Sequence, residues 1–84
     1  MPRRRVTLGN RKWKVTVARK PMKDWGQCIY DDKLIRLCPT TERHGVHREV
    51  FIHEVLHAIM PFLDEDCVKS AAIELDDALD AMEL

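Results

Sequence analysis

The sequence predicts an α+β fold, with a small, mostly antiparallel sheet of three or four strands followed by two helices. Short stretches rich in strand-forming residues fill the chain as far as Pro39. Neither glycine nor proline occurs over 46–60, and a second helical pattern extends over 64–82. Strands first and helices afterwards is the order typical of α+β domains.

The chain length predicts one domain, 1–84, with a single core. Such a short chain buries a modest share of its surface, and small domains often gain stability from a metal ion or a partner. A bound metal could therefore contribute to folding as well as to chemistry.

The sheet is expected to form from several short segments. A strand over 6–8 leads into a turn at 9–10, where Gly-Asn is a turn signal. Residues 13–19 follow as a half-buried strand with lysine outward, and 26–37 form a hairpin that turns at a pair of aspartates. We expect residues 1–5 to be a flexible basic tail.

Two helices should follow the sheet. The first begins between Thr41 and Gly45 and ends before Pro61, because the residue before a proline resists the α conformation. The second begins after Asp64, a suitable N-cap, and extends to about Met82. Its inward apolar stripe is expected to consist of Val68, Ala72, Leu75, Leu79 and Met82.

The central feature of the first helix is the motif His53-Glu54-x-x-His57, set among apolar neighbours. Residues four apart lie on one face of a helix, so His53 and His57 can share one cation. Two imidazoles at this spacing are typical ligands of a tetrahedral zinc ion. Glu54 projects beside them and can act as general base on a metal-bound water. In a buried helix these polar side chains are costly unless they are paired or bind a cation.

A catalytic zinc ion usually has three protein ligands, so one further donor is needed. Glu65 is the first candidate, because it lies three residues before Val68 and begins the inward face of the second helix. Asp64 and Asp66 are alternatives, although Asp64 is suited to capping and Asp66 falls off the inward face. All three could also be acids that only favour the positive helix end. Cys67 is a minor candidate that we expect instead to be a small buried thiol.

Three further side chains could assist the chemistry without binding the metal. His44 and His47 lie upstream of the motif and are expected to be exposed, and either could donate a proton if it lies over the cleft. Tyr30 could stabilise an oxyanion, but a tyrosine on a strand is more often a packing residue.

Charge is divided between the two ends of the chain, although the formal net charge is zero. Residues 1–23 carry nine Lys and Arg and no acid, whereas 64–84 carry eight Asp and Glu against Lys69 alone. A basic end could contact nucleic acid. We favour a solvated face, because strands commonly carry Lys and Arg outward for solubility.

Hydropathy gives no sign of a membrane segment. The longest apolar run is too short and too charged to span a bilayer, and no long apolar segment follows the basic N-terminus. We therefore expect no secretory signal peptide and a cytoplasmic location, in a bacterium or in a phage-infected host cell.

The chain resembles very small zincin-like metallopeptidase domains of phage and bacterial proteins, which are of gluzincin type and similar in style to the SprT-like and ImmA/IrrE groups. The resemblance is carried by residues 26–28, 34–37, 51–59 and 63–65 and extends over roughly 13–82. It implies His53, His57 and Glu65 as zinc ligands and Glu54 as the base. The chain departs from these groups in having no C-terminal zinc ribbon and a shortened glutamate segment.

The resulting functional hypothesis is a zinc-dependent metallopeptidase with one Zn²⁺ per chain, which acts on a peptide or protein substrate. An extended peptide could lie along an edge strand by β-augmentation. The alternative is a non-catalytic zincin-fold binding or regulatory module. Such a module could associate with nucleic acid through the basic N-terminus. No membrane partner is expected.

Overall fold

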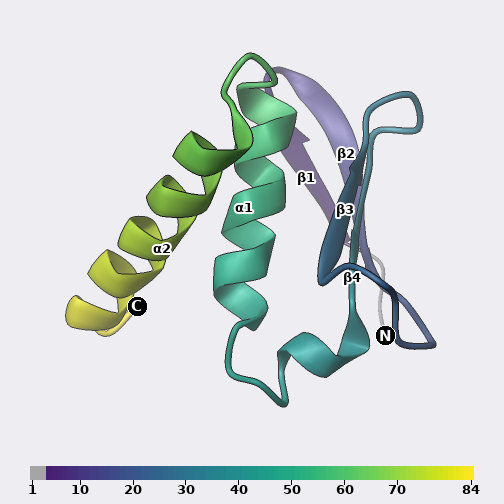
Figure 1. Ribbon diagram of the computed structural model, residues 1–84. Coiled ribbons are helices and arrows are strands. Elements are labelled where there is room, and N and C mark those ends of the chain that lie inside the picture. Colours follow the sequence, from purple (N-terminus) through teal and green to yellow (C-terminus); the bar gives the residue numbers. More distant parts are fainter. Residues whose placement is uncertain (1–3) are drawn as a thin grey trace.

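The computed structural model describes residues 4–84 and confirms the α+β prediction (Figure 1). Four strands come first and two helices follow, with a single 3-10 turn between them at Pro39–Thr41. The strands are β1 (Arg4–Leu8), β2 (Arg11–Val17), β3 (Gly26–Ile29) and β4 (Leu34–Leu37). The helices are α1 (His47–Ile59) and α2 (Glu65–Ala81).

The sheet is mixed, with the strand order β1-β2-β4-β3. β1 and β2 are antiparallel, as are β3 and β4, so the mostly antiparallel character and the hairpin over 26–37 are confirmed. The two hairpins meet through a parallel pairing of β2 with β4. β3 therefore forms one edge of the sheet.

The first strand begins earlier than the sequence suggested. Arg4 pairs with Val15 and Arg5 with Lys14, so the prediction of a flexible tail is wrong for Arg4 and Arg5. The rest of that tail lies outside the described residues. Two positive φ angles at 9–10 (58° and 64°) confirm the predicted turn and allow β1 to return directly as β2.

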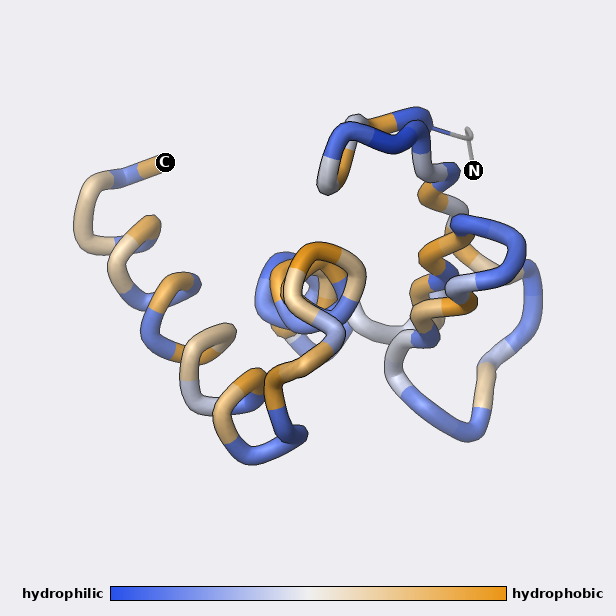
Figure 2. The backbone as a smooth tube through the Cα atoms, turned by 90° about the horizontal axis from the view of Figure 1, so that it is seen from above, coloured by the Kyte–Doolittle hydropathy of each residue, from blue (hydrophilic) through white to orange (hydrophobic). Residues whose placement is uncertain are grey.

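The molecule has three layers, with α1 between the sheet and α2 (Figure 2). The layer between sheet and α1 contains the larger core cluster, and a second cluster lies between the helices. The first consists of Trp13, Val15, Ile35, Leu37 and Val50. The second consists of Leu56, Val68 and Ala72.

The start of α1 differs from the prediction by two residues or more. Gly45 has a φ of +70°, a left-handed conformation that cannot belong to a right-handed helix, so α1 begins only at His47. At the other end, the Met60 amide donates to the Leu56 carbonyl, and Pro61 follows as predicted. The motif residues therefore occupy the second half of the helix.

α2 begins as the sequence indicated but diverges from α1 along its length (Figure 1). Val68 and Ala72 are buried against α1. Leu75 and Met82 are 46% and 70% exposed, so the predicted inward stripe is wrong for these two residues. Among the described residues, no helix is long and apolar enough to cross a membrane.

Candidate metal centre

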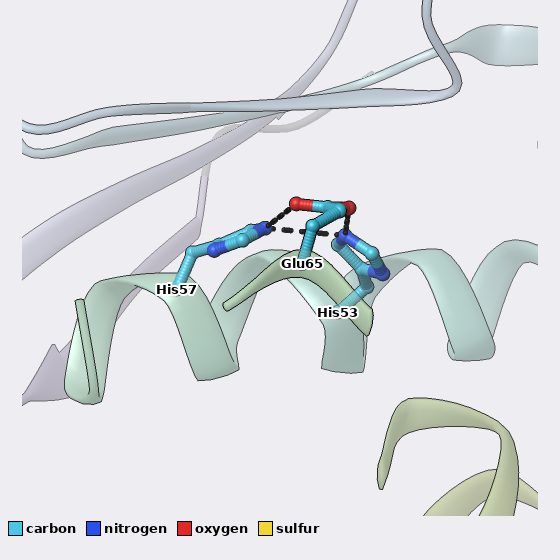
Figure 3. Close-up of side chains that lie close together, drawn as sticks. All are labelled: His53, His57 and Glu65. Atoms are coloured by element: carbon cyan, nitrogen blue, oxygen red, sulfur yellow. Dashed lines mark hydrogen bonds and ion pairs between the residues drawn. The ribbon is translucent and has the colours of Figure 1, made fainter. Parts of the chain in front are cut away.

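Two histidine side chains from adjacent turns of α1 point to the same place (Figure 3). The Nε2 atoms of His53 and His57 lie 3.2 Å apart. Both side chains are about one fifth exposed, so packing holds most of each ring in place. The sequence predicted this pairing from the spacing of four residues alone.

Glu65 joins the two histidines from the first position of α2 (Figure 3). One of its carboxylate oxygens lies 2.8 Å from His53 Nε2 and the other lies 3.0 Å from His57 Nε2. Its position follows from the tight turn after α1, because Asp64 caps α2 through the Cys67 amide at 2.8 Å. α2 therefore starts at Glu65, and the Glu65 side chain reaches the two histidines of α1.

The donor set matches what a zinc ion requires. Ligand atoms from the three residues all lie within 4.8 Å of one another. Two nitrogens bound at 2.0–2.1 Å to a tetrahedral zinc ion are separated by about 3.3 Å, and the two Nε2 atoms are 3.2 Å apart. Two imidazoles and one carboxylate form the three-ligand set typical of catalytic zinc, which keeps one position for water.

The other candidates for the third ligand are not in this group. Asp64 accepts the capping hydrogen bond from Cys67, which lowers the pKa of its carboxyl below the usual range. Asp66 is exposed and lies outside the group. Cys67 is exposed as well, so the prediction of a small buried thiol is wrong there. The first turn of α2 faces solvent on that side.

A cleft of about 640 Å³ opens above the three residues. Residues of α1 provide its floor, and the edge strand β3 with the residues around it provides one wall. The wall consists of Asp24, Trp25, Gly26, Gln27, Cys28, Ile29 and Tyr30. The floor consists of Val50, His53, Glu54 and His57, with Glu65 from α2. The cleft thus separates the donor group from an unpaired strand edge.

Hydrogen bonding fixes which backbone groups of that edge are free. The Cys38 amide donates to the Trp25 carbonyl at 2.8 Å, which makes this pair a hydrogen-bonded one. In an antiparallel ladder, hydrogen-bonded pairs alternate with non-hydrogen-bonded pairs, whose amide and carbonyl groups point away from the neighbouring strand. The amide and carbonyl of Gly26 and of Cys28 therefore point away from β4, towards the open edge.

Glu54 is the most buried charged side chain of the site, with 7% exposure. Its neighbour across the cleft is Gly26. A Cβ atom at Gly26 would lie 2.9 Å from Glu54 Oε2, so only glycine allows this close approach. Burial, followed by the negative charges of Glu65 and Asp24, raises the pKa of the Glu54 carboxyl from 4.5 to about 7. The side chain is thus poised to exchange a proton near neutral pH.

Tyr30 closes one end of the wall. Its hydroxyl donates to the His57 carbonyl at 2.9 Å, and its ring packs edge-on against Trp13. The side chain is 45% exposed, so it both packs and borders the cleft. Burial raises the pKa of the neighbouring Cys28 thiol to about 11, which keeps this cysteine a neutral thiol.

The two upstream histidines do not line the cleft. His44 is exposed, as predicted, and stacks on Trp25 with 5.5 Å between ring centroids. His47 is half-buried, so the prediction of an exposed residue is wrong there. Its Nδ1 lies 2.7 Å from the Thr41 hydroxyl, at the start of α1.

Sequence reasoning gave no site role to most of the wall, including Asp24, Trp25 and Gly26. Asp24 and Trp25 lie in what reads as an ordinary loop, and only the fold brings them to the cleft. Gly26 carried a usable signal, because a glycine inside a strand often marks a close backbone approach. Here the approaching group is the Glu54 side chain.

A second acidic group, formed by Asp76, Asp77 and Asp80 on α2, serves a different purpose. The Arg48 guanidinium forms ion pairs with Asp76 at 2.6 Å and with Asp80. These contacts join the first turn of α1 to the second half of α2, so the group has a structural partner of its own.

No protein-family model, curated protein or solved structure significantly matches the chain.

Proposed function

We propose that the protein is a small zinc-dependent metallopeptidase, with one Zn²⁺ held by His53, His57 and Glu65. The observation that carries the proposal is the convergence of both Nε2 atoms on one carboxylate, with ligand atoms within 4.8 Å. A buried glutamate beside this group and an open cleft above it support a catalytic role over a purely structural one.

The chemistry divides between the ion and the chain. When bound, zinc supplies a Lewis acid that polarises a carbonyl and lowers the pKa of a bound water. Glu54 takes a proton from the attacking water and passes it to the leaving amine. A bound cation favours the charged form of this carboxylate, the form that accepts the proton. Tyr30 is anchored to α1 through the His57 carbonyl and borders the cleft that would receive the scissile bond.

The substrate in this proposal is an extended peptide or a protein segment that can become extended. The free amide and carbonyl groups of Gly26 and Cys28 offer the edge on which such a chain can add as a further strand. Backbone pairing of this kind holds a substrate without a deep pocket, which suits a domain of 84 residues.

Membership of the gluzincin-type group, suggested by the resemblance of residues 51–59 and 63–65, is part of the same proposal. A cytoplasmic location is a part of it too, consistent with free thiols at all three cysteines.

The second candidate is a non-catalytic binding or regulatory module built on the same fold. It predicts a fourth protein ligand and no route for solvent to the metal. Among the described residues, the donor group holds three residues and faces the cleft, which favours the peptidase.

The first experiment measures the zinc content of protein purified without added metal. We expect about one zinc per chain in wild type, almost none in His53→Ala, and weakened retention in Glu65→Ala. Asp66→Ala is the matched control and should keep its zinc, since Asp66 lies outside the group. Zinc-free wild type with an intact fold would refute the metal site.

The second experiment tests the base. Wild type and Glu54→Gln are incubated with a mixed library of unstructured peptides, and new termini are identified by mass spectrometry. We expect Glu54→Gln to retain zinc and to lose at least about 100-fold in cleavage rate. Equal cleavage by both proteins would show that Glu54 is not the base.

A further inference from the structure

In the described part of the chain, every charged strand residue on the sheet face that the helices leave uncovered is positive. Both helices lie on the other side of the sheet (Figure 1). The strands contribute six cations and no Asp or Glu. Because side chains alternate across a strand, burial of Trp13 and Val15 places Lys12 and Lys14 on the uncovered face. The outer-face cations defined in this way are Arg5, Lys12, Lys14 and Arg36.

Strand pairing brings these cations close together. Arg5 lies directly opposite Lys14 across β1 and β2. Arg36, on the neighbouring strand β4, pairs with Thr16 of β2. Thr16 is two residues after Lys14 on the same strand, so both face the same side of the sheet. Like charges directly opposite one another destabilise a sheet, so the arrangement costs the free protein stability. Among residues 4–84, none of the outer-face cations has an ion-pair partner.

The face also has a hollow of about 450 Å³. Lys14, Arg19 and Arg36 surround it, together with the Thr16 hydroxyl and no carboxylate. Three cations and a hydroxyl around one hollow form the kind of donor set that receives a phosphate group. The whole patch spans three strands, roughly 10 Å across and 14 Å along.

We propose that the uncovered face of β1, β2 and β4 binds the phosphate backbone of double-stranded nucleic acid without reading its sequence. A duplex carries one charge about every 1.7 Å along its axis, so a patch of this size faces several phosphates. The described residues place no exposed aromatic ring on this face for unpaired bases to stack on, which favours a duplex over single strands. Among residues 4–84, it also has no large exposed apolar side chain to enter a membrane. The surface lies on the opposite side of the sheet from the cleft, so it is independent of the peptidase proposal.

The experiment measures fluorescence anisotropy of a labelled DNA duplex of about 24 base pairs between about 50 and 200 mM KCl. Four phosphate contacts predict a slope of log K against log salt of about −3.6, hence about a 150-fold loss of affinity over that range. Lys14→Ala/Arg36→Ala should roughly halve the slope, leaving about a 12-fold loss over the same range. Arg43→Ala/Lys69→Ala changes net charge equally at exposed positions outside the sheet and should leave the slope unchanged.

The double variant is expected to fold, and a single variant can replace it. Lys14→Ala relieves the repulsion with Arg5, so the double variant should fold. If it does not, Lys12→Ala alone should reduce the slope by about 1. The proposal is overturned if wild type shows no salt-dependent duplex binding or if the Arg43/Lys69 control weakens binding equally. Binding to polyglutamate without binding to the duplex would also overturn the proposal and would indicate an acidic protein as the partner. Binding only to phosphatidylserine vesicles would overturn it as well and would indicate a membrane surface.

Discussion

Glu54 occupies a position where negative charge is costly in the absence of a cation. It is 7% exposed, lies under the backbone of Gly26 and has the acids Glu65 and Asp24 nearby. Such a site makes sense if a divalent ion offsets the charges, because an isolated buried carboxylate otherwise prefers to be protonated. The residue is therefore a sensitive reporter of whether the metal is bound.

The raised pKa of Glu54 predicts how the stability of metal-stripped protein depends on pH. The unfolded chain loses this proton near pH 4.5 and the folded protein near pH 7, so the folded state is the weaker acid. Its contribution to the free energy of unfolding therefore decreases as pH rises from about 4.5 to about 7, by on the order of 2–3 kcal/mol. Glu54→Gln removes this dependence.

Urea unfolding of both proteins in chelator measures the effect. The stability of Glu54→Gln relative to wild type should increase between pH 5 and pH 7 and then level off. Saturating zinc should reduce the difference, because the cation favours the charged carboxylate. A difference between the two proteins that is the same at every pH would contradict the raised pKa.

At the level of elements, the site depends on how closely β3 approaches α1. Gly26 is the point of closest approach, where an added Cβ would lie 2.9 Å from both Glu54 Oε2 and Val50 Cγ1. The strand edge and the base are therefore positioned by the same contact. A side chain at this position should disturb both the packing and the chemistry.

Gly26→Ala is expected to lower the free energy of unfolding by about 1–3 kcal/mol, as overpacked positions do. Chemical denaturation measures this, with Gln27→Ala on the opposite face of β3 as the control. A double-mutant cycle with Glu54→Ala identifies the cause. The cost of Gly26→Ala should be smaller in the Glu54→Ala background, because one of the two clashes is gone. An equal cost in both backgrounds would locate the strain at Val50 alone.

At the level of the whole molecule, features set within one helix or turn could be predicted from the sequence, whereas features that depend on the pairing of distant strands could not. The spacing of His53 and His57 fixed their common direction, and the N-cap at Asp64 placed Glu65 at the start of α2. Both are properties of a single helix or turn, and the structure agrees with them.

Features that depend on distant pairing could not be predicted in the same way. The parallel pairing of β2 with β4 joins two hairpins, and nothing within either hairpin specifies it. That pairing makes β3 an edge strand and brings Asp24 and Trp25 to the cleft. The exposure of Leu75 arises likewise from the divergence of the two helices, whereas an apolar stripe alone predicts burial.

The donor group also connects two layers of the molecule, and this gives a prediction for global stability. His53 and His57 belong to α1 and Glu65 to α2, so an ion bound by all three holds the helices together at the cleft. Such an ion binds the folded state selectively, because the unfolded chain does not hold these ligands in place. Zinc at 100 times its dissociation constant should add about 2.7 kcal/mol to the free energy of unfolding.

Thermal unfolding with zinc and with chelator measures this increment. For a domain of this size each kcal/mol raises Tm by about 4–8 °C, so wild type should gain roughly 10–20 °C. His53→Ala should lose nearly all of the gain, and Glu65→Ala should lose a large part. His44→Ala, which removes an exposed histidine outside the group, should keep the gain in full. An equal gain in His53→Ala would show that zinc stabilises the protein from some other site, and the link between α1 and α2 would then have to be abandoned.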